Sequence, residues 1–358
     1  YGGVSLFVVV FAVYPFAAAL FKEANYPKRF VAPVIALGAF TATMDCLPGT
    51  PQIQNIIPTT YFGTNLYAAP LAGIIGAIII YGGGIFYLTH RLRHAVANGE
   101  GYGNHKINEP EHNEDMTYVN WKLAVIPLLA VLIINFVITE CVVWDPDILT
   151  PFQQMKGIPL VAAKLKNVVS IWALIISLVV GIVLALIVGK REIKSVDGLT
   201  KILNAGAIGS LLAIMNTASE VGYGNVISQL PGFADVAHFL INIHIGGTPL
   251  VSEAISVTVL AGITGSASGG MSIALELMSQ DWLTWAQSIG MGPEILHRVA
   301  SMASGGLDTL PHNGAVITLL AVCGLSHRES YKDIFAITLM KTFAVFVIIL
   351  IYSVTGLH

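Results

Sequence analysis

Long apolar stretches alternate with short polar segments along most of this chain. Five of the stretches are close to the length that a helix needs to cross a bilayer, about 20 residues, and they are 4–21, 66–89, 123–144, 168–189 and 335–354. Proline and charged residues lie mainly between them. The pattern therefore predicts an all-α integral membrane protein, folded as a multi-span helical bundle.

Other apolar segments are interrupted by proline, glycine and polar residues. The first interruption covers 45–64, where three prolines break any continuous helix. The second half has three more, near 216–233, 262–275 and 303–318. Lipid cannot satisfy free backbone groups, so an irregular backbone at membrane depth must face protein or a watery cavity. These segments predict re-entrant helical hairpins.

The same pattern divides the chain into three parts. Residues 1–89 hold the first-half spans with the broken hairpin around 45–64, 90–121 form a polar cytoplasmic loop, and 122–358 hold the second-half spans. The sequence is apolar from its first residues and has no charged leader ahead of them. We therefore expect further spans of the first half to precede residue 1.

Basic residues next to the spans set the orientation, because lysine and arginine are enriched in cytoplasmic loops. The residues predicted to be cytoplasmic on this rule are Lys22, Lys28, Arg29, Arg91, Arg93, Lys122, Lys190, Arg191, Lys194, Arg328 and Lys332. The loop that carries Asp145 and Asp147 is then predicted to lie outside.

Composition supports a membrane protein and excludes several other classes. Hydrophobic residues make up 55% of the chain and charged residues 11%, against about 25% charged in soluble domains. The net charge of −3 and the absence of a basic cluster argue against nucleic acid. The three cysteines form neither a disulfide framework nor a zinc-ligand spacing. No nucleotide loop or hydrolase signature is present, so no cofactor, metal or enzymatic activity is predicted.

Two stretches from opposite halves resemble each other. Residues 44–50 (MDCLPGT) and 307–313 (LDTLPHN) both read apolar-Asp-x-Leu-Pro and both follow small apolar residues. Corresponding broken segments in two halves are typical of transporters built from inverted repeats, whose half-helix ends bind substrate at the midplane. A chance match of a short motif is the alternative.

At these residues the sequence resembles the gluconate permease family of proton symporters. The resemblance rests on LPGTPQIQNIIPTTYFGT (47–64), GSASGGMSIAL (265–275) and the run 297–334 that contains GGLDTLPHNGA. It implies a proton-coupled secondary transporter of a hydroxy-acid, in a bacterial cytoplasmic (inner) membrane. It also implies inverted repeats, re-entrant hairpins and a mobile transport domain, and a homodimer would fit such a fold.

The sequence departs from the sugar-acid members of that family at both tips. Those members carry a Pro-Pro-His-Pro-Gly-Pro-like stretch where this chain has LPGTPQIQN, and an Asn-Asp-Ser-Gly-like tip where it has LPHNGA. Gluconate and a shorter hydroxy-monocarboxylate such as 3-hydroxybutyrate therefore remain alternative substrates.

Polar residues of the broken segments are the candidate substrate ligands. Amide and hydroxyl groups suit the hydroxyls and carboxylate of such an anion, and glycine permits close approach of a ligand to the backbone. The candidates are Thr50, Gln52, Gln54, Asn55, Ser266, Ser268, Gly269, Gly270, His312 and Asn313. The alternatives are capping of the broken helix ends and tight helix packing by small residues.

Three titratable residues of the repeat are the candidate proton carriers: Asp45, Asp308 and His312. Ionisable residues inside a membrane are functional candidates, and histidine titrates near neutral pH. The alternatives are helix capping by the two aspartates and a hydrogen-bonded tip histidine. Glu220 and Glu253 are weaker candidates, because each would also fit a membrane surface.

The sequence therefore predicts a symporter that moves a small organic anion with a proton across a lipid bilayer. Sodium coupling is the alternative within transport, while a channel or an intramembrane enzyme are alternatives from other classes. Arg298 would neutralise the substrate carboxylate, although its position favours a basic anchor at the membrane surface.

Overall fold

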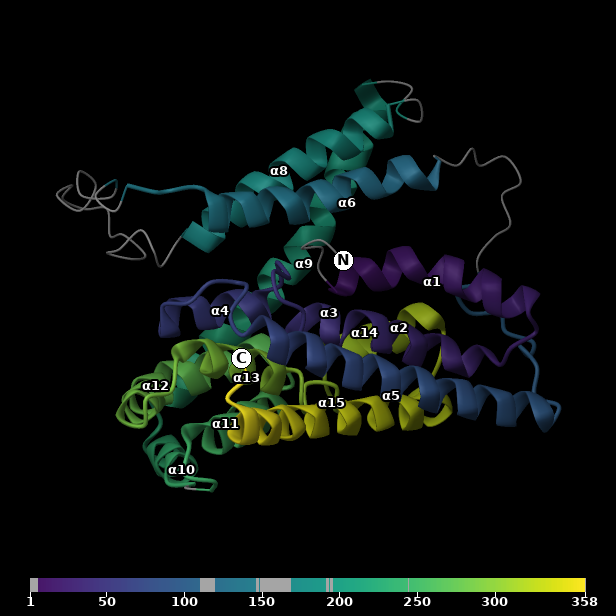
Figure 1. Ribbon diagram of the computed structural model, residues 1–358. Coiled ribbons are helices and arrows are strands. Elements are labelled where there is room, and N and C mark those ends of the chain that lie inside the picture. The colour runs from purple at the N-terminus through teal and green to yellow at the C-terminus, as the bar shows by residue number, and fades with distance from the viewer. Residues whose placement is uncertain are drawn as a thin grey trace.

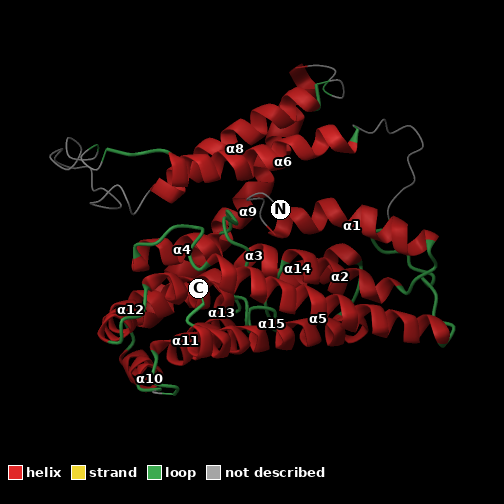
Figure 2. Ribbon diagram, in the orientation of Figure 1, coloured by secondary structure: helices red, strands yellow, loops and turns green. Residues whose placement is uncertain are grey.

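A computed structural model describes residues 6–109, 120–145, 148, 169–190, 193, 196–243 and 245–357. All regular elements within these ranges are helices (Figure 2). The predicted all-α bundle is therefore confirmed. Figure 1 shows a layered bundle in which most helices lie roughly along one direction, with α6 and α8 side by side above the others.

The first half of the chain forms one long helix on each side of a broken segment. Its elements are α1 (Leu6–Glu23), the 3-10 turn η1 (Lys28–Phe30), α2 (Val31–Ala39), α3 (Ala42–Asp45), α4 (Ile53–Phe62) and α5 (Pro70–Ala97). The predicted loop 90–121 begins too early, because α5 continues to Ala97 and ends where Gly99 takes a φ of +81°.

The middle of the chain contains α6 (Trp121–Phe136), the π-helix η2 (Val137–Cys141), α8 (Val169–Val188), α9 (Val196–Ser228) and α10 (Pro231–Ile241). The interruption expected near 216–233 is narrower than predicted, since α9 runs unbroken through 216–225. Helix α9 ends at Ser228. Pro231 is the first residue of α10, a position at which its missing N–H breaks no helical hydrogen bond.

The second half ends with α11 (Pro249–Thr264), α12 (Ala267–Ser288), α13 (Pro293–Ser304), α14 (Gly314–Cys323) and α15 (His327–Thr355). The chain leaves its helical path between α11 and α12 and again between α13 and α14. These two gaps fall inside the predicted broken segments 262–275 and 303–318.

The two Asp-x-Leu-Pro stretches lie in the same order of elements. Each is followed by a helix of 10 residues (α4 and α14), then by a left-handed glycine, Gly63 or Gly324, and then by a long helix of 28 or 29 residues (α5 and α15). Figure 1 shows α5 and α15 side by side and running in opposite directions. This arrangement is what an inverted repeat produces.

Three helices of the described ranges are long and apolar enough to cross a membrane: Pro70–Ala97, Lys122–Thr139 and His327–Thr355. Large apolar side chains point outward from them, including Ile78, Phe86 and Phe343, which are 66%, 76% and 65% exposed. Water would not tolerate so much apolar surface, whereas lipid does. The chain is therefore a membrane protein.

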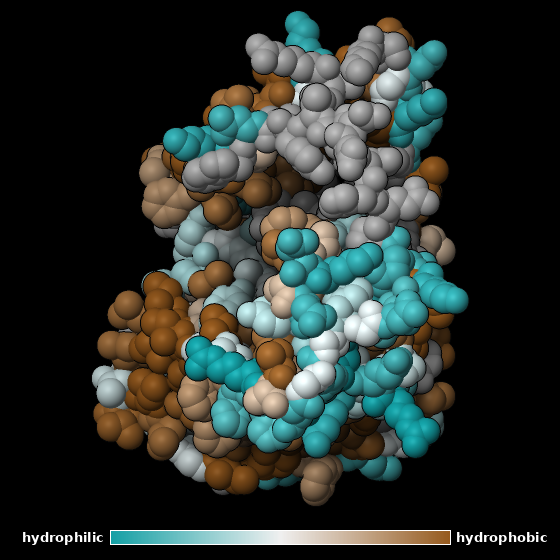
Figure 3. Space-filling model, turned by 90° about the vertical axis from the view of Figure 1, so that its right-hand side faces the viewer, coloured by the Kyte–Doolittle hydropathy of each residue, from teal (hydrophilic) through white to brown (hydrophobic). Residues whose placement is uncertain are grey.

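Polar side chains gather at one end of the bundle. Figure 3 looks onto the end where α1 and α5 finish and α15 begins, with polar surface concentrated there and apolar surface on the flanks. Arg29 donates to both carboxylate oxygens of Glu100, at 2.6 and 3.0 Å, and this bond holds the pKa of Glu100 below its usual value. The structure thus brings basic residues that the sequence predicts to be cytoplasmic to one face.

Asp333 connects three parts of this end. Its carboxylate is 1% exposed and accepts hydrogen bonds from Tyr87 at 2.9 Å, Arg91 at 3.0 Å and Arg29 at 3.3 Å. These donors come from α5 and from the connection between α1 and α2. Asp333 therefore joins that connection and α5 to α15.

Replacing Asp333 with asparagine should lower the free energy of unfolding by about 2 kcal/mol, because hydrogen bonds to a charged group are lost. The measurement is thermal unfolding of the purified protein in detergent. Asp281, exposed on α12, supplies the matched control Asp281→Asn. Equal melting temperatures for the two variants would contradict a connecting role for Asp333.

Candidate functional site

Two irregular segments meet in the bundle: the first tip, residues 46–52 between α3 and α4, and the second tip, residues 305–313 between α13 and α14. A Cβ atom at Gly305 would clash with Oδ2 of Asp45, which ends α3. Only glycine permits this approach. The Asp45 carboxylate thus lies against the start of the second tip.

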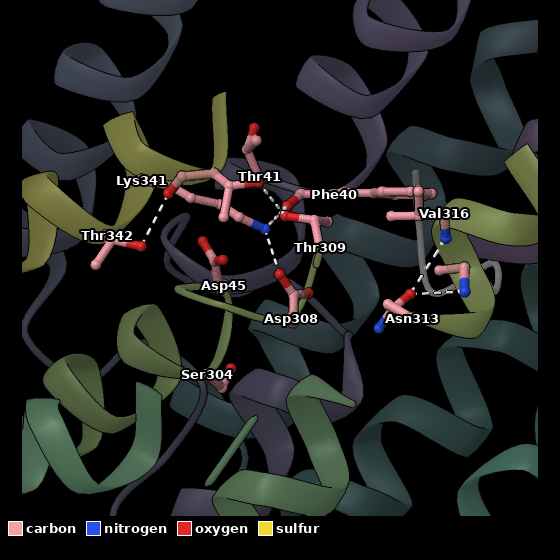
Figure 4. Close-up of polar contacts among 12 residues, drawn as sticks. Phe40, Thr41, Asp45, Ser304, Asp308, Thr309, Asn313, Val316, Lys341 and Thr342 are labelled. Atoms are coloured by element: carbon pink, nitrogen blue, oxygen red, sulfur yellow. Dashed lines mark hydrogen bonds and ion pairs between the residues drawn. The ribbon is translucent and has the colours of Figure 1, made fainter. Parts of the chain in front are cut away.

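Lys341, on α15, contacts both the second tip and the end of α2. Its ammonium donates to the carboxylate of Asp308 at 2.5 Å and to the carbonyl of Phe40, at the end of α2, at 2.9 Å (Figure 4). The lysine side chain is 1% exposed. A buried ion pair needs further hydrogen bonds to offset desolvation, and the Phe40 carbonyl provides one.

Asp45 lies beside this ion pair, close enough to interact electrostatically with Lys341 and Asp308. One of its oxygens accepts a weak hydrogen bond from the Cys46 thiol at 3.0 Å, and the other, Oδ2, has no partner among the described residues although Asp45 is 1% exposed. We call Asp45, Asp308 and Lys341 the central cluster. It contains two acids, one base and an unsatisfied buried oxygen.

Arg298, on α13, holds the first tip in place. It is fully buried and donates to the carbonyls of Ala68, Leu66 and Asp45 at 2.8–3.3 Å. It also donates to Oδ1 of Asn55 at 3.1 Å. Five donors in a rigid fork suit several carbonyls at once. The interpretation of Arg298 as a basic surface anchor is therefore wrong.

Asn55 takes part in the same network. Its Nδ2 donates to the carbonyls of Thr50 and Leu66, both at 2.9 Å, and its Oδ1 lies 3.0 Å from Nε2 of His297. Thr50 Oγ1 donates to the carbonyl of Thr43 at 2.6 Å. The side chains of Asn55 and Thr50 thus tie the irregular backbone together.

The two glutamines of the first segment differ in position. Gln52 is the residue before α4, without a side-chain hydrogen bond to the helix end. Gln54 lies within α4, and its buried Oε1 has no partner within the described ranges. Gln54 thus offers a free acceptor to a hydroxyl group.

The second tip is attached to the break between α11 and α12. His312 Nε2 lies 2.9 Å from the carbonyl of Gly262, and Asn313 donates to the carbonyl of Gly265. Asn313 also caps α14 by accepting from Ala315 and Val316, at 2.6 and 3.2 Å. His312 and Asn313 thus lie together, at the break rather than at Lys341.

The Ser/Gly segment forms the start of α12. Ser266 caps this helix by accepting from the backbone N–H of Gly269 at 3.0 Å, and Ser268 Oγ is 3.4 Å from Ser266 Oγ. A Cβ atom at Gly270 would clash with the backbone nitrogen of Ala261 in α11. Ser266 thus caps a helix, and Gly270 permits two helices to pack closely. The sequence left these roles open as alternatives to substrate binding.

The structure brings Asp45 and Asp308 together around a cation that the sequence interpretation missed. Lys341 is the one charged residue in the stretch 335–354, and a lone ionisable residue in an apolar span was the available signal. Among the described residues, no three His, Cys, Asp or Glu side chains are arranged to hold a metal ion. The site thus combines a buried ion pair with a second carboxylate that keeps one oxygen unsatisfied among the described residues.

A helical membrane bundle with two broken segments meeting at buried charges defines a membrane transport protein. The chain is 50% identical, over 366 aligned positions that cover all of it, to the Bacillus subtilis (strain 168) protein named "Uncharacterized transporter YxjC". It covers 76% of that relative's length. The chain belongs to the family of this transporter. No family model matches it, and no solved structure does.

Proposed function

We propose that the protein is a proton-coupled secondary transporter of a small hydroxy-carboxylate in the bacterial cytoplasmic membrane. The observation that carries this proposal is the central cluster. Buried charges are costly in a membrane protein and mark substrate and proton paths. Here they lie where the two halves of the internal repeat meet.

The charges of the cluster suggest how coupling works. When Asp45 and Asp308 are both ionised, their two negative charges exceed the single positive charge of Lys341, and an entering carboxylate is repelled. Protonation of Asp45 removes one negative charge, and the anion then competes with Asp308 for the Lys341 ammonium. Asp45 suits the proton because its Oδ2 has no hydrogen-bond donor, whereas Asp308 is paired with Lys341. We assign His312 the role of linking the second tip to α11 through Gly262, and not that of carrying the proton.

The Lys341 ammonium also favours protons over sodium. It lies against a carboxylate and a carbonyl at a broken helix end, which are the kinds of groups that bind sodium in transporters with discontinuous helices. The Lys341 ammonium thus occupies the position that a sodium ion would need. The resemblance to the gluconate permease family supports the same coupling and the hydroxy-acid substrate, with Gln54 as a candidate hydroxyl ligand.

Uptake into proteoliposomes tests the proposal. The protein is reconstituted, an inward proton gradient is imposed without sodium, and labelled gluconate and 3-hydroxybutyrate are followed side by side. We expect concentrative uptake of one of them, abolished by a protonophore. Uptake only after sodium is added would replace proton coupling by sodium coupling. Absence of uptake of both anions under either gradient would contradict the proposed function.

A further inference from the structure

A further buried acid, Glu253, lies outside the central cluster. Glu253 on α11 is 0% exposed, and neither of its carboxylate oxygens has a hydrogen-bond partner among the described residues. Ser256 lies three residues later, on the same side of the helix, and its buried hydroxyl also has no partner in the part of the chain that the structure describes. Ser252, by contrast, is satisfied by Leu240 and Trp282. Glu253 and Ser256 thus form a polar site that nothing in the described part of the fold occupies.

No charged side chain compensates Glu253 within the described part of the chain. Counting only residues whose side chains the structure describes, the titratable groups on the helices packed against α11 are Asp235 on α10; Glu276 and Asp281 on α12; Glu294, His297 and Arg298 on α13; and His327, Arg328, Glu329, Tyr331, Lys332, Asp333, Lys341 and Tyr352 on α15. None of them forms an ion pair or hydrogen bond with Glu253. Keeping an isolated ionised carboxylate away from water is costly, and binding a proton would remove that cost.

The helix that carries Glu253 is also attached to the second tip. Near the end of α11, the carbonyl of Gly262 lies 2.9 Å from Nε2 of His312. The carbonyl of Gly265 accepts a hydrogen bond from Asn313. Thr258 donates to the carbonyl of Ala303 at 3.1 Å, just before Gly305. Ionisation of Glu253 would therefore disturb a helix whose other end contacts the tip that carries Asp308.

We propose that Glu253, with Ser256, forms a second proton-binding site whose proton moves with the substrate. This inference rests on the proposed function and extends it to stoichiometry. One proton at Asp45 and one at Glu253 accompany one monocarboxylate, so each cycle carries a net charge of +1 inward. Uptake is then driven by membrane potential as well as by the pH gradient.

Membrane potential separates the two proton sites. Proteoliposomes receive a fixed inward pH gradient and a potassium-diffusion potential, and uptake of labelled 3-hydroxybutyrate and gluconate is measured. For the wild type, an interior-negative potential of about 100 mV should raise the accumulation ratio by up to roughly 50-fold, the factor for one charge. Glu253→Gln should keep uptake driven by the pH gradient and lose the response to potential.

Wild-type uptake that follows the pH gradient but ignores the potential would overturn the second site and leave the proposed function intact. A Glu253→Gln variant that responds to potential like the wild type would also overturn it. Glu276→Gln is the matched control, because Glu276 is exposed on the neighbouring helix α12. It should behave as the wild type does.

Thermal unfolding in detergent tests the site without any transport. A carboxyl that is neutral when folded and ionises when unfolded destabilises the protein as the pH rises above the usual glutamate range. The melting temperature of the wild type should fall over that range, and that of Glu253→Gln should fall less. Identical pH profiles for the two proteins would overturn the inference, even if neither transports the anions tested.

Discussion

Replacing Lys341 with methionine should reduce carboxylate uptake by about 100-fold or more, corresponding to roughly 3 kcal/mol of lost interaction. The substitution removes the cation that the substrate needs and leaves Asp308 buried without its partner. Breaking a buried ion pair in this way costs about 3–5 kcal/mol of stability. The measurement is initial uptake in proteoliposomes, normalised to the amount of folded protein.

A double variant separates the loss of binding from the loss of stability. Asp308→Asn combined with Lys341→Met removes both charges, so it should recover much of the melting temperature and none of the uptake. Lys332→Met, at an exposed position on the same helix, is the matched control and should transport normally. Substantial uptake by Lys341→Met would remove Lys341 from the anion site.

Replacing Arg298 with methionine should have the largest effect on stability. Arg298 satisfies three buried carbonyls and the Asn55 side chain, and methionine donates to none of them. Each buried acceptor left unsatisfied costs about 1–3 kcal/mol, so we expect a loss of at least about 4 kcal/mol. The free energy of unfolding of native proteins is only about 5–15 kcal/mol, so little folded protein should be recovered.

The fraction of monodisperse protein after detergent extraction, with its melting temperature, measures this effect. Arg93→Met is the matched control, since Arg93 is exposed on α5 and the same charge is removed. Arg298→Lys should fall between the two, because a lysine has donors but no planar fork. A stable, monodisperse Arg298→Met protein would contradict the role of Arg298 in holding the first tip.

The helical class and the location of the broken segments could be predicted because both depend on local sequence. Proline and glycine interrupt helices wherever they lie, and the repeated Asp-x-Leu-Pro motif alone was enough to identify Asp45 and Asp308 as a pair. The end of α5 was placed too early because charged residues after residue 89 indicate a membrane edge and not the end of a helix.

Partners distant in sequence could not be predicted. Lys341 lies 33 residues beyond Asp308 in the chain, and no local pattern states that the two side chains meet. Glu253 and Arg298 fitted a membrane surface by composition alone, whereas both are fully buried. For Thr50, Asn55 and Asn313 the sequence left substrate binding and capping of broken helix ends as alternatives, and the structure shows their side chains bonded to the backbone.

Proton movement driven by the substrate is the most direct test of coupling. Proteoliposomes with equal pH on both sides, no sodium and an internal pH dye receive an inward gradient of the transported anion. We expect acidification of the interior together with anion entry, abolished in Lys341→Met and reduced per anion in Asp45→Asn. Entry of the anion without acidification would contradict proton coupling and, with it, the role assigned to the central cluster.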